Sequence, residues 1–400
     1  MHAVPVIALI DGEHHPSTVR DALAGLDLAG VVFCGGEEKL GTGSLEEHYG
    51  MPVEPDAEEG LRRLAPRADT VVDLADEPVV PASRKLRLAA LALSLGLAYE
   101  APGARLDPPR YEPVAFDGPK LAVIATGKRT GKTAVAGHWA ALLRDQGVDP
   151  VIVCMGRGGP REPTLTETAP SLDELIALAE SGSHAASDYL EDAVIAGVPT
   201  VGCRRVGGGF AGAPHDSNVP DGARVAASLA PGAIVFEGSG ACIPPVEVDR
   251  TVCILGAGAP EPLAEYRLAR ADVVLAARGV PEPPADAIPF SLRSEPFEDV
   301  PADARVAVFT TGSTEVEGIP EPALLSTNLA RRAALAAELD QAAAANCDVY
   351  LTELKAAAID AVAVRARAEG ARVVFIRNRP IGIDDALVKL YRDARDAARK

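Results

Sequence analysis

The sequence is poor in positive charge and in aromatic side chains. Lysine and arginine number 39 against 57 aspartate and glutamate residues, which gives a formal net charge of −18 over 400 residues. Binding to nucleic acid or to an anionic membrane needs a basic surface, so this balance argues against both. Aromatic residues make up only 4% of the chain, which leaves little for base stacking. We therefore expect the partner to be a small molecule.

The chain also lacks paired cysteines and long hydrophobic runs. Its six cysteines are scattered without C-x-x-C spacing, so we expect reduced, structural thiols rather than a disulfide framework or a zinc site. The nearest approach to a membrane span, residues 86–98, is interrupted by Arg87, Ser94 and Gly96, and we interpret it as a buried helix. The first ten residues lack a basic leader segment, and we expect a cytoplasmic protein.

A proline-rich segment divides the chain into two parts, in line with the two or three domains that its length predicts. Residues 1–102 alternate apolar runs at 6–10, 30–33 and 70–74 with helical patterns, which predicts a small Rossmann-like α/β domain. Residues 103–119 hold too much proline for a helix or a central strand and are the expected linker.

Residues 120–400 repeat the α/β alternation on a larger scale. The predicted strands are residues 121–125, 151–154, 233–236, 251–255, 273–276, 306–310, 349–351 and 373–376. Several are continuously apolar, which is typical of buried parallel strands. We predict a doubly wound, mostly parallel sheet with ligands bound beyond the carboxyl ends of its strands.

Residues 123–133, VIATGKRTGKT, join an apolar run to a Gly/Lys/Thr loop and then to a helical pattern. The loop glycines allow a tight turn whose backbone N–H groups face a polyphosphate. Lys132 supplies a mobile charge for the β- and γ-phosphates, and the hydroxyl of Thr133 suits a Mg²⁺ ligand. Thr126 stands where the pattern G-x-x-x-x-G-K-[ST] has its first Gly, so this is a variant P-loop, with a plain strand-to-helix turn as the alternative. We predict a P-loop NTPase-like domain that binds ATP or GTP through Gly127, Thr130, Gly131, Lys132, Thr133 and Ala134.

Arginines follow two further apolar runs. The segment MGRGGPREP (155–163) carries Arg157 and Arg161, and RRVGGGFAG (204–212) carries Arg204 and Arg205 beside Gly207 and Gly208. Arginine suits bidentate contacts with phosphate, and its concentration in glycine-rich loops of an acidic chain favours a phosphate-binding role. The alternative is pairing with structural carboxylates.

Four other groups carry less specific signals. Glu237 ends a buried run in VFEGSG (235–240) and could hold Mg²⁺ beside the P-loop, or cap a turn. His184 and Asp188 fall at i and i+4 of a predicted helix and could orient a substrate or pair with each other. Lys355 follows an apolar run and could reach the site, and NLARR (328–332) adds further cations. The cluster DGEHH (11–15) invites a metal-site interpretation, but without a third ligand we favour a polar loop.

Four segments together resemble the cyclic 2,3-diphosphoglycerate synthetase family over the whole chain: LIDGEH (9–14), VVFCGGEEK (31–39), ATGKRTGKT (125–133) and residues 184–212. The resemblance implies ATP-dependent closure of 2,3-bisphosphoglycerate to its cyclic anhydride, with release of ADP and phosphate. The segments TGKRTGKT and VFEGSG are also similar to the P-loop and the V-E-G-x-G strand end of dethiobiotin synthetase-like ATPases. Those enzymes phosphorylate an oxyanion before an internal nucleophile closes a ring. The choice of ATP over GTP rests on these resemblances.

On this resemblance, one substrate phosphate attacks the γ-phosphorus of ATP and the second displaces inorganic phosphate. We expect Lys128, Arg129 and Lys132, with Mg²⁺ on Thr133 and Glu237, to neutralise the developing charge. No general base is needed for a phosphate oxyanion, which agrees with the lack of a Ser/His/Asp or Cys/His constellation. The expected substrate-binding residues are Arg157, Arg161, His184, Arg204, Arg205, Gly207, Gly208 and Lys355.

Two other functions stay open. A phosphoglycerate kinase or an ATP-dependent carboxylate ligase would share the same scaffold. A nucleotide-dependent switch ATPase would share the loop, but such proteins usually carry K-G-G-x-G-K-[ST], whose first Lys would fall at Gly127. For the assembly, a homodimer is the default expectation.

Overall fold

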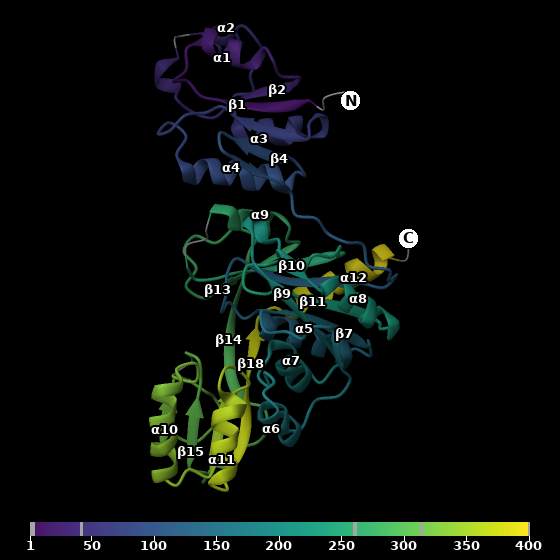
Figure 1. The fold of residues 1–400 in the computed structure, drawn as a ribbon, viewed down its shortest axis with the longest axis vertical. Coiled ribbons are helices and arrows are strands. Elements are labelled where there is room, and N and C mark those ends of the chain that lie inside the picture. The colour runs from purple at the N-terminus through teal and green to yellow at the C-terminus, as the bar shows by residue number, and fades with distance from the viewer. Residues whose placement is uncertain (1–4, 41–42, 259–261, 313–314, 399–400) are drawn as a thin grey trace. The chain divides into compact units, whose positions relative to one another are not determined.

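The computed structural model describes residues 5–40, 43–258, 262–312 and 315–398 (Figure 1). The chain forms two compact units. The first comprises Met1–Arg110, Gly209–Ala213 and Ala259–Arg270, and the second comprises Tyr111–Gly208, Pro214–Gly258 and Ala271–Lys400. Among the helices described, none is long and apolar enough to cross a membrane.

The first unit is built on a five-stranded sheet of order β2-β1-β3-β4-β5, parallel except for the last, antiparallel pair. The predicted strands are present as β1 (Val6–Ile10), β2 (Leu28–Phe33) and β3 (Thr70–Asp73), and the sheet adds β4 (Ala98–Ala101) and β5 (Ala104–Leu106). The last of these comes from the expected linker and lies at the sheet edge, where proline-rich sequence is tolerated. The α-helices are α1 (Pro16–Leu23), α2 (Leu45–Tyr49), α3 (Ala57–Leu64), α4 (Ala82–Ser94) and α9 (Glu265–Ala269).

The helix expected over residues 86–98 is α4, shifted toward the N-terminus. It ends at Ser94, and Gly96 follows with a φ of +81°. Such a backbone conformation ends helices and favours glycine, so the chain turns here into β4.

The second unit contains one large sheet of order β10-β9-β7-β11-β6-β12-β13-β14-β18-β17-β15-β16, with β8 paired to β9. Its P-loop half runs parallel from β9 to β14. The strands of that half are β6 (Lys120–Ala125), β7 (Pro150–Gly156), β8 (Thr164–Thr166), β9 (Thr200–Val206), β10 (Asp216–Ser217), β11 (Ala233–Glu237), β12 (Arg250–Leu255), β13 (Val273–Ala277) and β14 (Ile288–Pro296). All the strands predicted in this half are present, which confirms the doubly wound, mostly parallel α/β fold.

The C-terminal half of the sheet runs in the opposite direction. Strand β18 (Arg372–Ile381) pairs antiparallel with β14, and β17 (Val349–Glu353), β15 (Val306–Phe309) and β16 (Leu324–Ser326) continue parallel to β18. The helices of the second unit are α5 (Lys132–Asp145), α6 (Leu172–Glu180), α7 (Asp188–Ala196), α8 (Val219–Ser228), α10 (Arg332–Ala344), α11 (Val364–Ala368) and α12 (Asp384–Ala398), with a π-helix over Ala358–Ala363.

Strand β14 carries the chain past the carboxyl edge of the P-loop half. Its last pairing with β13 is at Phe290 and it continues to Pro296, on the order of 20 Å farther at about 3.3 Å per residue. Figure 1 shows β14 and β18 as long strands leading to the lobe that carries α10 and α11. Glu353, at the carboxyl end of β17, lies level with Ile376 of β18, which faces Pro296. The carboxyl ends of the P-loop strands and of β17 are therefore directed toward the same space.

Helix α5 anchors the P-loop in the core of this unit. Val135, Trp139 and Leu143 are fully buried on its predicted apolar face. The indole N–H of Trp139 donates to the carbonyl of Leu387 on α12 at 3.1 Å. The P-loop is thus held between a buried strand and a buried helix.

Candidate active site

The P-loop joins β6 to α5 through a turn with two residues in the left-handed region. Gly131, at the N-cap of α5, has a φ of +94°, and Arg129 has a φ of +58°. Lys132 is buried, and its ammonium donates to the carbonyl of Gly127 at 2.9 Å. The lysine side chain therefore folds back over its own loop, where its ammonium could contact a bound anion.

The electrostatics of Lys132 fit this role. Burial lowers the pKa of its ammonium to about 8, and the nearby carboxylate of Glu237 only partly opposes the shift. Neutral oxygens are its hydrogen-bond acceptors, with the hydroxyl of Thr130 at 3.5 Å. A bound phosphate would supply the counter-charge that the ammonium lacks.

Glu237 lies at the end of β11, the neighbour of the P-loop strand. Its carboxylate accepts from the hydroxyl of Thr133 at 2.6 Å and from the thiol of Cys154 at 2.9 Å. Burial raises the pKa of Glu237 and holds the pKa of Cys154 well above its usual value. Cys154 therefore stays a thiol and orients the carboxylate. Thr133 and Glu237 thus lie side by side, as the two predicted Mg²⁺ ligands should.

Helix α7 brings three more carboxylates to the P-loop. Glu191 lies 3.2 Å from the ammonium of Lys355, which follows β17. Burial raises the pKa of Glu191 to about 7, and Lys355 opposes that shift. Asp192 is 1% exposed, and among the described residues no group donates a hydrogen bond to either of its oxygens. Asp188 begins the helix one turn earlier.

A cavity of about 220 Å³ lies between the loops that follow β7 and β11 and the start of α7. Arg157 and His184 line it, together with Ser187, Asp188 and Ser239. Gly240 has a φ of +62°, which favours glycine, and a side chain there would displace the Arg157 guanidinium. This cavity combines the Arg157 guanidinium and the His184 imidazole with small residues and the Asp188 carboxylate, and the guanidinium suits a compact anion.

Arg205 holds the backbone of the loop after β11, which forms one wall of this cavity. Its guanidinium donates to the carbonyl of Gly207 at 2.9 Å and to the carbonyl of Ser239 at 3.0 Å. Ser239 lines the cavity, so Arg205 fixes the backbone of the loop after Glu237. Burial lowers the pKa of Arg205.

The predicted cations fall into two groups. Arg157 and His184 line the cavity, and Lys355 reaches the carboxylates of α7. Lys128, Arg129, Arg161 and Arg204 are exposed and are not among the residues that line this cavity, whereas Arg157 and His184 are exposed residues that do line it. Arg161 lies 4.0 Å from Glu162, and Arg204 precedes Arg205 on a strand whose successive side chains point to opposite faces.

The structure also places His184 and the DGEHH segment (11–15), which carried less specific signals in the sequence. His184 is not on a helix, because α7 begins only at Asp188 with Ser187 as its N-cap. The two residues nevertheless share the cavity. In the DGEHH segment, Asp11 accepts from the N–H of Glu13 at 2.9 Å and lies 2.9 Å from Nδ1 of His14. Over the described residues, the cluster close enough to share a metal ion is Cys154, Asp192 and Glu237.

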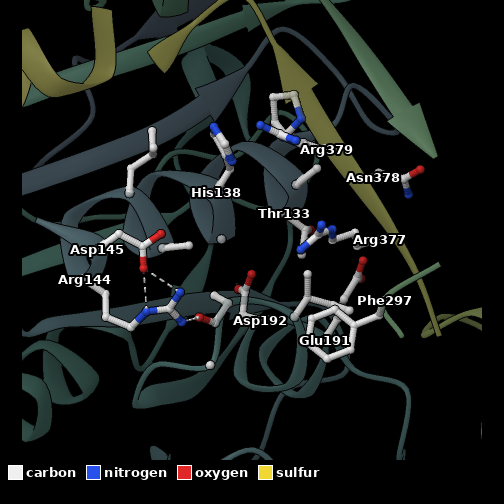
Figure 2. Close-up of a pocket in the computed structure, with 18 of the residues that line it drawn as sticks. Thr133, His138, Arg144, Asp145, Glu191, Asp192, Phe297, Arg377, Asn378 and Arg379 are labelled. Atoms are coloured by element: carbon white, nitrogen blue, oxygen red, sulfur yellow. Dashed lines mark hydrogen bonds and ion pairs between the residues drawn. The ribbon is translucent and has the colours of Figure 1, made fainter. Parts of the chain in front are cut away.

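A second cavity of about 350 Å³ runs along α5 from Thr133 to Asp145 (Figure 2). Glu191 and Asp192 line one side, and Arg377 and Arg379 of β18 line the other. Figure 2 shows Arg377 directed toward Thr133. These two arginines were missed, although they follow a predicted strand as Arg157 does. The strand was expected to end at residue 376 and in fact continues to Ile381.

Comparison with known proteins identifies the family. Models of three domains of cyclic 2,3-diphosphoglycerate synthetase match the chain: the N-terminal domain over residues 5–107, the P-loop domain over 120–284 and the C-terminal domain over 320–379. Among solved structures, the apo form of LpxK from Aquifex aeolicus in complex with ATP is 17% identical, with a TM-score of 0.42 over 72% of this chain and 90% of that chain. That likeness is too low to support an inference.

Full-length relatives agree with the domain matches. The protein named cyclic 2,3-diphosphoglycerate synthetase from Rubrobacter xylanophilus is 42% identical over 96% of this chain and 97% of the relative. Proteins of the same name from Thermococcus onnurineus and Methanothermus fervidus are 37% and 34% identical, over 94% and 98% of this chain and 95% and 97% of theirs. The chain therefore belongs to the cyclic 2,3-diphosphoglycerate synthetase family.

Proposed function

We propose that this protein closes 2,3-bisphosphoglycerate to cyclic 2,3-diphosphoglycerate at the expense of ATP, with release of ADP and phosphate. The observation that carries the proposal is the P-loop with Lys132 and Thr133 beside a cation-lined cavity, in a chain of this family. A nucleotide phosphate on the P-loop and a compact anion in the cavity would lie on either side of Asp188 and Glu237. That arrangement suits phosphoryl transfer between them.

The first step joins two anionic groups. One phosphate oxygen of the substrate attacks the γ-phosphorus of ATP, and the bond to the β-phosphate oxygen breaks to leave ADP. Lys132 holds the nucleotide phosphates, and the backbone N–H groups of the loop face their oxygens. Lys128 and Arg129 are exposed at the loop and can swing onto the transferring group.

The second step closes the ring. The other phosphate of the substrate attacks the phosphorus of the substrate phosphate that received the γ-phosphoryl group. The former γ-phosphoryl group then leaves as inorganic phosphate. Arg157 and His184 hold the substrate so that its two phosphates meet, and Arg205 fixes the loop after β11. Orientation of this kind is worth roughly 7–11 kcal/mol. Arg161, Arg204, Gly207, Gly208 and Lys355 complete the proposed substrate-binding set.

The residues beside the P-loop fit a magnesium ion. Thr133 and Glu237 offer a hydroxyl and a carboxylate oxygen 2.6 Å apart, and hard oxygen ligands are those that Mg²⁺ prefers. A bound Mg²⁺ would neutralise the phosphate charge that builds up during transfer. In the same proposal the protein is a cytoplasmic homodimer with a catalytic domain over residues 120–400, a linker over 103–119 and an N-terminal domain over 1–102.

Substrate-dependent release of ADP tests this function. We expect rapid ADP release with 2,3-bisphosphoglycerate and background release with 2-phosphoglycerate, with 3-phosphoglycerate and without substrate. The variant Lys132→Ala is the matched control and should stay at background with all of them. Strong turnover of a monophosphoglycerate would favour the kinase, and equal hydrolysis without substrate would favour the switch ATPase.

A further inference from the structure

Among the described residues, two of the buried carboxylates beside the P-loop are not paired with a cation. Glu191 is paired with Lys355 at 3.2 Å. Over the part of the chain that the structure describes, no ammonium or guanidinium lies at hydrogen-bond distance from Asp192 or Glu237. Their polar neighbours are the neutral thiol of Cys154 and, for Glu237, the hydroxyl of Thr133. Neither of these two buried carboxylates is paired with a cation, and one divalent ion placed close to both would supply a counter-charge.

The geometry lets one ion reach both carboxylates. One ligand atom each from Cys154, Asp192 and Glu237 lies within 4.8 Å of the others. Oxygens on one Mg²⁺, each at about 2.0–2.1 Å, lie up to roughly 4.2 Å apart, so a shift of well under 1 Å brings them into range. Neither oxygen of Asp192 has a donor among the residues that the structure describes, and the residue is 1% exposed. Figure 2 shows its carboxylate directed into the cavity that Thr133 also lines.

We propose that Asp192 is a further protein ligand of the divalent ion held by Thr133 and Glu237. The inference rests on the proposed function, because the ion is the one that accompanies the nucleotide. Cys154 remains a donor to Glu237 and does not bind the ion, since Mg²⁺ prefers oxygen. Position 137 of α5 is glycine, and a methyl group there would lie 3.4 Å from Oδ1 of Asp192. The small residue leaves the carboxylate room to move onto the ion.

Because Asp192 lies on α7, an ion bound to it would also affect the position of that helix. Asp192 lies one helical turn after Asp188, and Asp188 lines the proposed substrate cavity. An ion on Thr133, Glu237 and Asp192 would therefore fix α7 against the P-loop. The arrival of the metal–nucleotide complex would in this way set the wall of the substrate cavity.

Manganese binding to the full-length protein with saturating ADP tests the inference. We expect Asp192→Asn to weaken Mn²⁺ binding, measured by the loss of the free-ion electron paramagnetic resonance signal, at least about tenfold. Asp188→Asn removes a nearby charge without removing the ligand and should change the affinity by less than about threefold. Cys154→Ser should bind Mn²⁺ as the unaltered protein does. Unchanged affinity in Asp192→Asn would overturn the proposal, because it would show that Asp192 does not bind the ion.

A second measurement needs no variant and so does not depend on the folding of Asp192→Asn. In protein labelled with ¹³C at the aspartate γ-carboxyl, bound Mn²⁺ should show a strong ¹³C hyperfine coupling, since Thr133 and Glu237 carry no label. Absence of that coupling would contradict the proposal. Neither experiment contains a phosphoglycerate, so failure of the proposed cyclisation would appear separately, in the product of the unaltered protein.

Discussion

Lys132 links the burial of the P-loop to the pH dependence of nucleotide binding. Burial lowers its pKa to about 8 in the free protein, and bound phosphate favours the charged form and raises the pKa again. The affinity for ADP should therefore be constant below about pH 8 and fall as the pH rises above it. Calorimetric titration between pH 6.5 and 9.5 measures this. In Lys132→Arg, which stays charged over the whole range, the decline should disappear; its persistence would assign it to another group.

Arg157 and Arg161 lie in one loop but should differ in function. Both side chains are exposed, but Arg157 lines the proposed substrate cavity, whereas Arg161 is not among its lining residues and lies near Glu162. Charge-assisted hydrogen bonds are worth about 1.5–3 kcal/mol, so Arg157→Ala should raise the KM for the bisphosphate about 10- to 100-fold and leave the Kd for ADP nearly unchanged. Arg161→Ala is the control and should keep both values. An equal effect of the two substitutions on KM would contradict the assignment.

At the scale of elements, Trp139 joins α5 to α12. It is fully buried, and its N–H donates to the carbonyl of Leu387 at 3.1 Å. Trp139→Phe would remove this hydrogen bond and leave a gap beside the carbonyl, with an expected cost of about 1–3 kcal/mol. We expect a lower midpoint for the thermal transition that ADP and Mg²⁺ raise. Leu229→Ala, at a site 39% exposed, should leave that midpoint almost unchanged, and equal losses would refute the bridging role.

The strands of the P-loop half could be predicted because each is a continuous apolar run between turn residues. Strand β14 was missed, since Pro289, Ser291 and Arg293 interrupt its apolar pattern. Its outer part leaves the parallel half and pairs only with β18, so polar side chains are tolerated there. The start of α7 was also misplaced, because Ser187, an ordinary N-cap residue, stands inside a stretch of helical pattern.

The residues of the candidate site could likewise be predicted only in part from the sequence. The P-loop residues and Glu237 could be found because each follows a recognisable run and carries chemistry at fixed spacing. Asp192 could not, because nothing in the sequence indicates that the middle of a helix meets the end of β11. Arg377 and Arg379 required the true length of β18. Contacts between distant segments decide which charged residues of a loop or helix reach the site.

At the scale of the whole molecule, the net charge of −18 and the cation-lined site act together. The acidic surface repels polyanions such as nucleic acid, while Lys132, Arg157 and Lys355 lie where strand ends converge. This distribution of charge favours a small anion, which can reach these cations, over a large polyanion, which the acidic surface repels. The reversal of the sheet at β14 and β18 directs the end of β17 toward the P-loop half.

Phosphorus NMR of the protein with ATP, Mg²⁺ and 2,3-bisphosphoglycerate tests the central claim most directly. The account predicts new phosphoanhydride signals in the phosphoglycerate product, matched by stoichiometric ADP and inorganic phosphate, and no such signals with Lys132→Ala. If ATP is consumed while the bisphosphoglycerate signals remain unchanged, or if a phosphorylated product accumulates without release of phosphate, the protein does not close the ring.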